Sequence, residues 1–137
     1  MTANTPQSRK AKGRQFQQDI RADLVARFGI AEGDILSTAM GQSGLDIYLS
    51  PAARCRFPFG VEAKRQEKLD IPAWWRQCEH NANVEGLTPL LVFRRSHEDA
   101  LAVLRWADLL SLIAEVGRGA PEGDHRWQNL AEGITGD

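Results

Sequence analysis

Charged residues interrupt two short apolar runs that otherwise have the alternating pattern of β-strands. The run LDIYLS holds Asp46 between leucine and isoleucine, and the run FGVEAK holds Glu62 and Lys64. Because side chains alternate across a strand, Glu62 and Lys64 point to the same face. Burying an unpaired charge costs free energy. The chain is therefore restricted to folds in which these positions either face solvent or line a polar site.

A helix is expected before these strands, because apolar residues recur there at every fourth position: Phe16, Ile20, Leu24 and Phe28. Gly29 is placed to end this helix. Gln17 lies three positions before Ile20 and is expected on the buried flank of the helix.

The rest of the chain predicts alternating strands and helices. Asp70 and Pro72 are suited to begin a helix, and Gly117 is placed to end the last one. The expected order is strands at 34–40, 45–50 and 59–64 with a loop at 50–58, a helix at 73–83, strands at 88–95 and 100–106, and a helix at 106–116. This order indicates an α/β fold with a mixed central sheet and helices on both faces.

Length and composition indicate one ordinary globular domain of 137 residues. We expect a flexible basic arm at 1–12, a domain at 13–117 and a loosely held C-terminal tail at 118–137. The net charge of −1 means that a nucleic-acid partner would need a local basic patch.

The cysteines and histidines have no metal-ligand spacing. Cys55 and Cys78 lie far apart and are expected to be reduced thiols. The chain has no signal peptide and no apolar run that could span a membrane, so we expect a cytoplasmic protein without a membrane partner.

Asp46 and Glu62 are the candidate metal ligands. If the second and third strands pair, the two carboxylates can point toward one place, where they repel each other unless a cation lies between them. Oxygen ligands with water in the remaining positions suit Mg²⁺, for which Mn²⁺ can substitute. Lys64 can then hold a water or steady a phosphate oxygen. The alternative is a solvated strand edge or a surface ion pair.

Several strings resemble the PD-(D/E)xK nuclease superfamily. GLDIYLS, VEAK and WRQ are similar to its GxD, ExK and helical glutamine motifs. KGRQFQQDI is similar to the opening helix of archaeal-type Holliday junction resolvases. MGQSGLD and SPAAR…FPF are similar to phage-encoded resolvase-like endonucleases. The resemblance covers about residues 12–113.

The resemblance implies a restriction-endonuclease-like fold with an αβββαβ core, and Mg²⁺-dependent cleavage of branched DNA by a homodimer. It implies that Asp46 and Glu62 ligand the metal, that Lys64 serves the nucleophile and that Gln77 supports the site. The related enzymes often carry glutamate where this chain has Gln17, which is a further candidate site residue because its amide oxygen can still ligand a cation or a water, although it brings no charge. A surface position explains Gln77 equally well.

Candidate nucleic-acid contacts flank these motifs. Each has a plain alternative: solvated termini or loops explain the basic residues, and turn chemistry explains Ser43. A hydroxyl or a cation near a nuclease site can also bind a backbone phosphate. The candidates are Arg9, Lys10, Lys12, Arg14, Gln42, Ser43, Arg65 and Lys68.

The sequence therefore predicts a Mg²⁺-dependent, structure-selective endodeoxyribonuclease similar to the Holliday junction resolvases of DNA recombination. It would bind branched or duplex DNA in the cytoplasm, which is the host cytoplasm if a phage or prophage encodes it. One alternative is a catalytically weak or inactive DNA-binding or assembly protein on the same fold. The other is a simple nickase or restriction-like nuclease.

Overall fold

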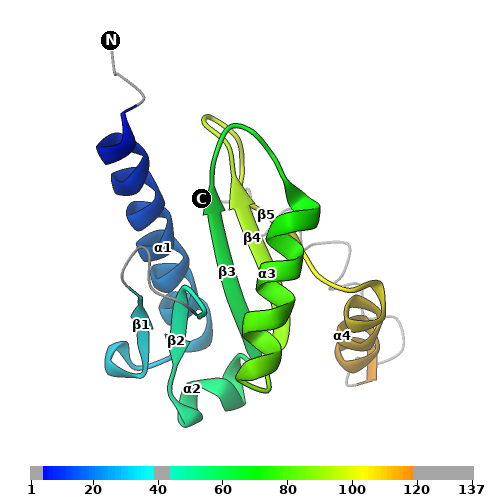
Figure 1. Cartoon of the computed structure of the whole chain (residues 1–137). Helices are drawn as coiled ribbons and strands as arrows, with labels where there is room; N and C mark the ends of the chain where they lie inside the picture. The colour runs from blue at the N-terminus through cyan, green and yellow to red at the C-terminus, as the bar shows by residue number, and fades with distance from the viewer. Residues whose placement is uncertain (1–4, 39–43, 119–137) are drawn as a thin grey trace. The chain divides into compact units, whose positions relative to one another are not determined.

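The computed structural model describes residues 5–38 and 44–118 (Figure 1). The chain divides into two compact units, Met1–Arg105 and Trp106–Asp137. Among the described residues, the first unit contains all the strands and the helices α1 to α3, and the second contains α4 (Trp106–Arg118). The candidate site residues that the structure describes belong to the first unit.

Helix α1 (Pro6–Phe28) buries Phe16, Ile20 and Leu24 of the predicted stripe together with Gln17, whereas Phe28, in the last position of the helix, is exposed. The helix ends at Gly29, whose φ of +61° is left-handed and whose N–H donates to the Val25 carbonyl. The prediction of a flexible arm at 1–12 is wrong for residues 6–12. The Thr5 side chain caps this segment by accepting a hydrogen bond from the Ser8 amide, and Pro6 fits the first turn.

The strands form two small sheets instead of one central sheet. β1 (Ile35–Ser37) and β2 (Ile47–Leu49) pair antiparallel. β4 (Thr88–Arg94) lies between β3 (Phe59–Arg65), to which it is parallel, and β5 (Leu101–Val103), to which it is antiparallel. The prediction of a single mixed sheet is therefore corrected among the described residues, because no strand ladder joins β2 to β3.

The segment predicted as a loop at 50–58 contains a short helix, α2 (Pro51–Arg56). Ser50 caps it, since its hydroxyl accepts a hydrogen bond from the Ala53 amide at 3.2 Å. Pro51 fits the first turn. A 3₁₀ turn, η1 (Glu32–Asp34), precedes β1.

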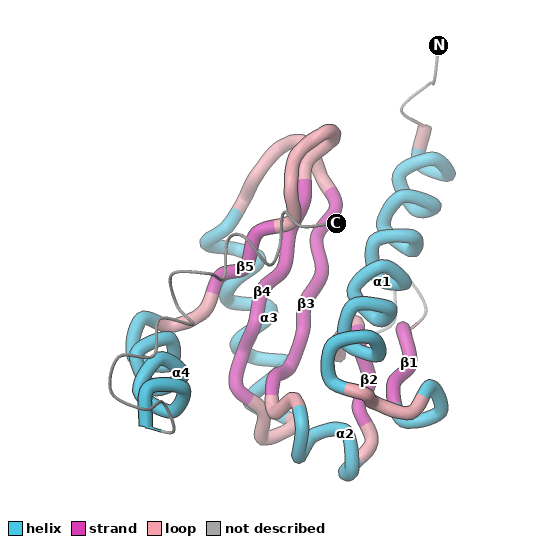
Figure 2. The backbone as a smooth tube through the Cα atoms, turned by 180° about the vertical axis from the view of Figure 1, so that it is seen from behind, coloured by secondary structure: helices cyan, strands magenta, loops and turns pink. Residues whose placement is uncertain are grey.

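Helices α1 and α3 (Ile71–Val84) cover opposite faces of the β3–β4–β5 sheet (Figures 1 and 2). On one face, Val61 of β3 packs in a core cluster with Phe16, Ile20 and Leu24 of α1. On the other face, Trp74 and Cys78 of α3 pack against Leu91 and Phe93 of β4. Glu62 and Lys64 are the register partners of Leu91 and Phe93, so they lie on the α3 face.

Gly60 allows α3 to approach β3 closely. A Cβ atom at this position would lie 2.8 Å from the Cβ of Ala82 and 3.1 Å from its Cα. The start of α3 follows the prediction, because the Asp70 carboxylate accepts a hydrogen bond from the Ala73 amide. The close contact of Gly60 with Ala82 seats α3 over the strand that carries Glu62.

Helix α4 continues through Gly117, which the sequence predicts as its end, to Arg118. Residues 119–137, which make up nearly all of the predicted tail, lie outside the described residues. Among the described helices, none combines the length and the apolar character that crossing a membrane requires. Both cysteines are free thiols, with Cys55 exposed and Cys78 buried.

Candidate active site

The side chain of Asp46 connects β2 to β3. The Asp46 amide donates to the Val61 carbonyl at 3.2 Å, and the Ala63 amide donates to Asp46 Oδ2 at 2.7 Å. Thr38 fixes the Asp46 backbone, because its amide donates to the Asp46 carbonyl at 2.8 Å. One carboxylate oxygen of Asp46 thus takes the place of a strand partner along the edge of β3.

Glu62 is nearly inaccessible, with 1% of its surface exposed. Its Oε1 accepts a hydrogen bond from Asn81 Nδ2 at 3.4 Å, whereas its buried Oε2 has no hydrogen-bond partner among the described residues. Burial, followed by the negative charge of Asp46, raises the pKa of Glu62 to about 8. The positive charge of Lys64 lowers this pKa, so all three predicted residues are electrostatically linked.

Asn81 is the residue that the sequence reasoning did not assign. Its Nδ2 donates to Glu62 Oε1 and also to the Gly44 carbonyl at 3.2 Å, which lies just before Asp46. Gln77, one turn earlier on α3, is exposed, and no hydrogen bond joins it to Asp46 or Glu62 within the described segments. The four-residue spacing of Gln77 and Asn81 puts them on one face of α3, and this spacing could have indicated Asn81 as a site residue. The role of Gln77 stays a prediction.

Gln17 is 3% exposed and lies against β1. Its Oε1 accepts a hydrogen bond from the Ser37 hydroxyl at 3.2 Å, and the same hydroxyl oxygen accepts one from Gln18 at 3.3 Å. The expected burial of Gln17 is confirmed, and its support of the site stays a prediction.

The residues present fit a hard divalent cation. Two carboxylates meet where β2 reaches β3, and the buried Oε2 of an ionised Glu62 accepts no hydrogen bond from the described residues. Within 5–38 and 44–118, no group of three or more His, Cys, Asp and Glu side chains could hold a metal. A site with two carboxylates suits Mg²⁺, which usually keeps several water ligands.

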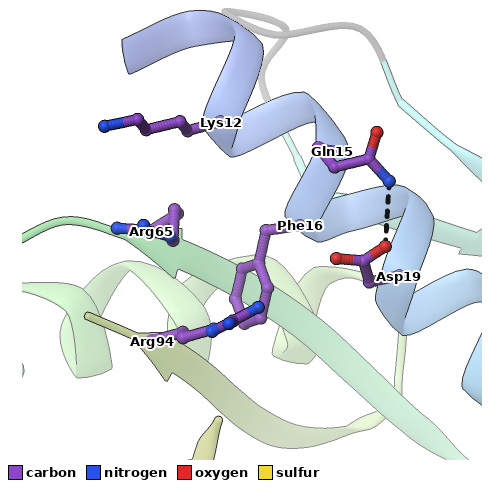
Figure 3. Close-up of a pocket in the computed structure, with 6 residues that line it drawn as sticks. All are labelled: Lys12, Gln15, Phe16, Asp19, Arg65 and Arg94. Carbon is purple, nitrogen blue, oxygen red and sulfur yellow. Dashed lines mark hydrogen bonds between the residues drawn. The ribbon is translucent and has the colours of Figure 1, made fainter. Parts of the chain in front are cut away.

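The predicted nucleic-acid contacts have different surroundings. Arg9, Lys10, Lys12 and Arg14 are exposed on the first half of α1, and Lys68 is exposed after β3. Arg65 is partly buried and pairs with Glu67 at 2.8 Å. Lys12 and Arg65 line one pocket together with Arg94, which was not predicted (Figure 3). Gln42 and Ser43 lie outside the described residues.

Comparison with known proteins identifies the family. Residues 8–122 match the family model described as "Phage putative PDDEXK endonuclease". Searches of curated proteins and of solved structures gave no match. The match covers most of the chain and includes Asp46, Glu62 and Lys64, and a mixed α/β structure is consistent with it. The chain therefore belongs to the phage PDDEXK endonuclease family of the PD-(D/E)xK superfamily.

Proposed function

We propose that the chain is a Mg²⁺-dependent endodeoxyribonuclease that hydrolyses phosphodiester bonds in branched DNA of the Holliday junction type. The observation that carries the catalytic part is the meeting of Asp46 with the buried Glu62, whose Oε2 has no hydrogen-bond partner among the described residues. Two adjacent carboxylates in a buried place favour a bound cation, because each raises the energy of the other's charged form.

In this proposal Asp46 and Glu62 hold the divalent cation, which supplies Lewis acidity at the scissile phosphate when bound. Mn²⁺ can replace Mg²⁺ because both accept carboxylate and water oxygens. Lys64 lies on the same strand face as Glu62 and orients the attacking water or the phosphate through its ammonium group. Asn81 holds Glu62 Oε1 in place, which leaves Oε2 for the cation.

The choice of branched DNA depends on sequence likeness. MGQSGLD and SPAAR…FPF are the strings that resemble phage resolvase-like endonucleases. Symmetric resolution of a junction needs two cuts, and this chain has one D…ExK set. We therefore propose a symmetric homodimer that acts in DNA recombination, in the cytoplasm of the host.

The test compares a labelled four-way junction with a linear duplex of the same sequence, each with Mg²⁺ and with EDTA. The proposal expects Mg²⁺-dependent cleavage that is faster on the junction. Asp46→Asn is the matched control, since the amide oxygen of asparagine can still accept the Ala63 amide while the charge is lost. Equal cleavage of junction and duplex would support a nickase or restriction-like enzyme instead. Undiminished cleavage by Asp46→Asn would remove Asp46 from the site.

A catalytically weak or inactive DNA-binding protein is the second candidate. Gln17 favours it, because a neutral amide stands where related enzymes often carry a carboxylate, and this amide accepts a hydrogen bond from Ser37. DNA binding without cleavage at any Mg²⁺ concentration is the result that this alternative expects.

A further inference from the structure

A second charged site lies on the α1 face of the sheet, opposite to the face of Glu62 and Lys64. A pocket of about 190 Å³ is lined by residues of α1, β3 and β4: Lys12, Gln15, Phe16, Asp19, Arg65 and Arg94. Figure 3 shows Lys12 and Arg65 to the left of the Phe16 ring, the Arg94 side chain crossing the ring in this view, and the hydrogen-bonded Gln15 and Asp19 to the right. Arg94 lies outside the segments GLDIYLS, VEAK and WRQ that resemble the superfamily motifs.

The two arginines are brought together by strand register. Arg65 and Arg94 end the parallel strands β3 and β4 and are direct register partners. Neighbouring strands lie about 4.8 Å apart, and like charges directly opposite each other destabilise a sheet. The fold therefore contains a repulsion between the Arg65 and Arg94 guanidinium groups, and an anion bound in the pocket would reduce it.

The cations of the pocket are only partly neutralised. Arg65 pairs with Glu67 at 2.8 Å, and its Nη2 donates to the Ser96 hydroxyl at 3.0 Å, so this guanidinium is held in place. Arg94 donates through Nε to the Glu98 carbonyl at 3.0 Å. Neither Arg94 nor Lys12 has an ion pair within the described part of the chain. Asp19 is the one carboxylate of the lining, against three cations.

We propose that Lys12, Arg65 and Arg94 bind a backbone phosphate of the DNA substrate. Arginine presents paired N–H donors that match two phosphate oxygens, and Lys12 adds a third cation from α1. Arg65 and Arg94 are partly buried, which makes their bonds to a phosphate stronger than they would be in open solvent.

The position along β3 suits a contact beside the cleavage site. Arg65 lies three residues beyond Glu62, which is about 10 Å along an extended strand. β3 is an edge strand of its sheet, and Asp46 bonds to this edge at Val61 and Ala63, so DNA held at the Asp46–Glu62 site can reach Arg65 at the end of the same strand. The identity of the ligand as DNA rests on the proposed nuclease function, whereas the anion site itself rests on the pocket.

The experiment measures DNA binding instead of cleavage. Fluorescence anisotropy of a labelled junction is recorded in EDTA at roughly 50 to 200 mM NaCl, where affinity reports the number of phosphate contacts. Arg94→Gln should weaken binding roughly tenfold and reduce the slope of log K against log salt by about 0.9, the value for one contact. Lys12→Gln should act in the same direction, and the double variant should be weaker than either.

Arg27→Gln is the matched control, because Arg27 is an exposed arginine in the last turn of the same helix and lies outside the pocket. It loses the same charge but should change affinity and slope much less. Arg94→Lys should restore part of the affinity, since it returns the charge without the paired donors. Circular dichroism melting checks that each variant is folded, and Lys12→Gln tests the pocket at an exposed residue if Arg94→Gln is unstable.

A separate arm titrates inorganic phosphate at constant ionic strength and follows thermal unfolding. If phosphate stabilises the parent but not Arg94→Gln, while both bind DNA equally, the pocket takes free phosphate and the proposal is overturned. Equal affinity and equal salt slope for Arg94→Gln and Arg27→Gln would also overturn it, and would leave the nuclease proposal intact if the parent cuts DNA. A parent protein that binds no DNA would overturn both proposals.

Discussion

At the scale of single residues, one oxygen of each carboxylate in the candidate site holds the side chain in place and the other is left without such a bond. Asp46 Oδ2 accepts a hydrogen bond from the Ala63 amide, and this bond leaves Oδ1 for a cation. Glu62 gives Oε1 to Asn81, and Oε2 has no hydrogen-bond partner among the described residues. Each carboxylate therefore has one oxygen that fixes its orientation and one that is available for chemistry.

Lys64 should act on the reaction and not on the fold, because it is only partly buried and lies beside Glu62 on the strand face. We predict that Lys64→Ala lowers the single-turnover rate of DNA cleavage on the order of a hundredfold or more. The thermal unfolding midpoint should change little. Single-turnover rates equal to those of the parent would show that Lys64 is an ordinary solvated lysine.

The raised pKa of Glu62 predicts a pH dependence of stability in the metal-free protein. Glu62 has an ordinary pKa of 4.5, which applies in the unfolded chain, and about 8 in the fold. Between these values the folded state binds more protons, so the free energy of unfolding falls as pH rises, by an amount on the order of a few kcal/mol. The contribution of Glu62 to stability is fully present below the lower value and is lost above the higher one.

Thermal melts in EDTA from about pH 4.5 to 8 measure this dependence. Glu62→Gln removes the titrating group and should flatten the profile over the same interval. Parallel profiles for the parent and Glu62→Gln would contradict the prediction.

Gln17 offers a test of metal affinity. If its side chain supports the cation, Gln17→Glu should add a charge and lower the Mg²⁺ concentration needed for half-maximal cleavage. The new carboxylate would still accept the Ser37 hydroxyl, so the contact with β1 can survive. Identical Mg²⁺ midpoints for the two proteins would show that Gln17 does not support the cation.

At the scale of elements, local patterns predicted the helices and strands better than they predicted how these pack. The four-residue spacing from Phe16 to Leu24 predicted α1 correctly, because burial of one face follows directly from helical period. Helix α2 was missed, although Ser50 and Pro51 together are a start signal. A helix of six residues is too short to show the apolar period by which longer helices are predicted.

The connection between the two sheets could not be predicted from sequence. It is made by the backbone amide and the side chain of Asp46, and the spacing of apolar residues does not indicate these bonds. The choice between Gln77 and Asn81 was also beyond the sequence, because both share a face of α3. Which of the two meets Glu62 depends on how α3 lies over β3, and that is set by the close contact of Gly60 with Ala82.

This contact gives a prediction about the seating of α3. In Gly60→Ala the new Cβ would meet both Ala82 carbons and the side chain of Leu45, which lies 3.0 Å away. We expect a loss of about 1–3 kcal/mol in the free energy of unfolding, because α3 must move outward. The matched control is Gly33→Ala, where a Cβ would have no neighbour within 4 Å. Equal urea midpoints for both variants would contradict the tight contact.

At the scale of the whole molecule, the proposed homodimer makes a direct prediction. A stable interface should bury at least about 1,000 Å² in total. Exposed apolar side chains are available in both units, including Leu101 on the edge strand β5 and Trp106 at the start of α4. The chain has a mass of 15.2 kDa, so sedimentation at micromolar concentration should give a species of twice that mass.

A single species at the monomer mass would reject a stable free dimer. Dimerisation would then have to occur on the DNA, and sedimentation of the junction complex would show it as two chains per junction.

The bond between Asp46 and the edge of β3 also bears on how such a chain diverges over evolutionary time. Replacing this aspartate by an apolar residue would leave the Ala63 amide without its acceptor, at a cost of about 1–3 kcal/mol if the amide stays buried. A descendant that no longer cut DNA would still be selected to keep a hydrogen-bond acceptor at this position. Retention of the aspartate in a relative is therefore weak evidence of nuclease activity, whereas retention of Glu62, whose buried charge is costly, is the stronger indicator.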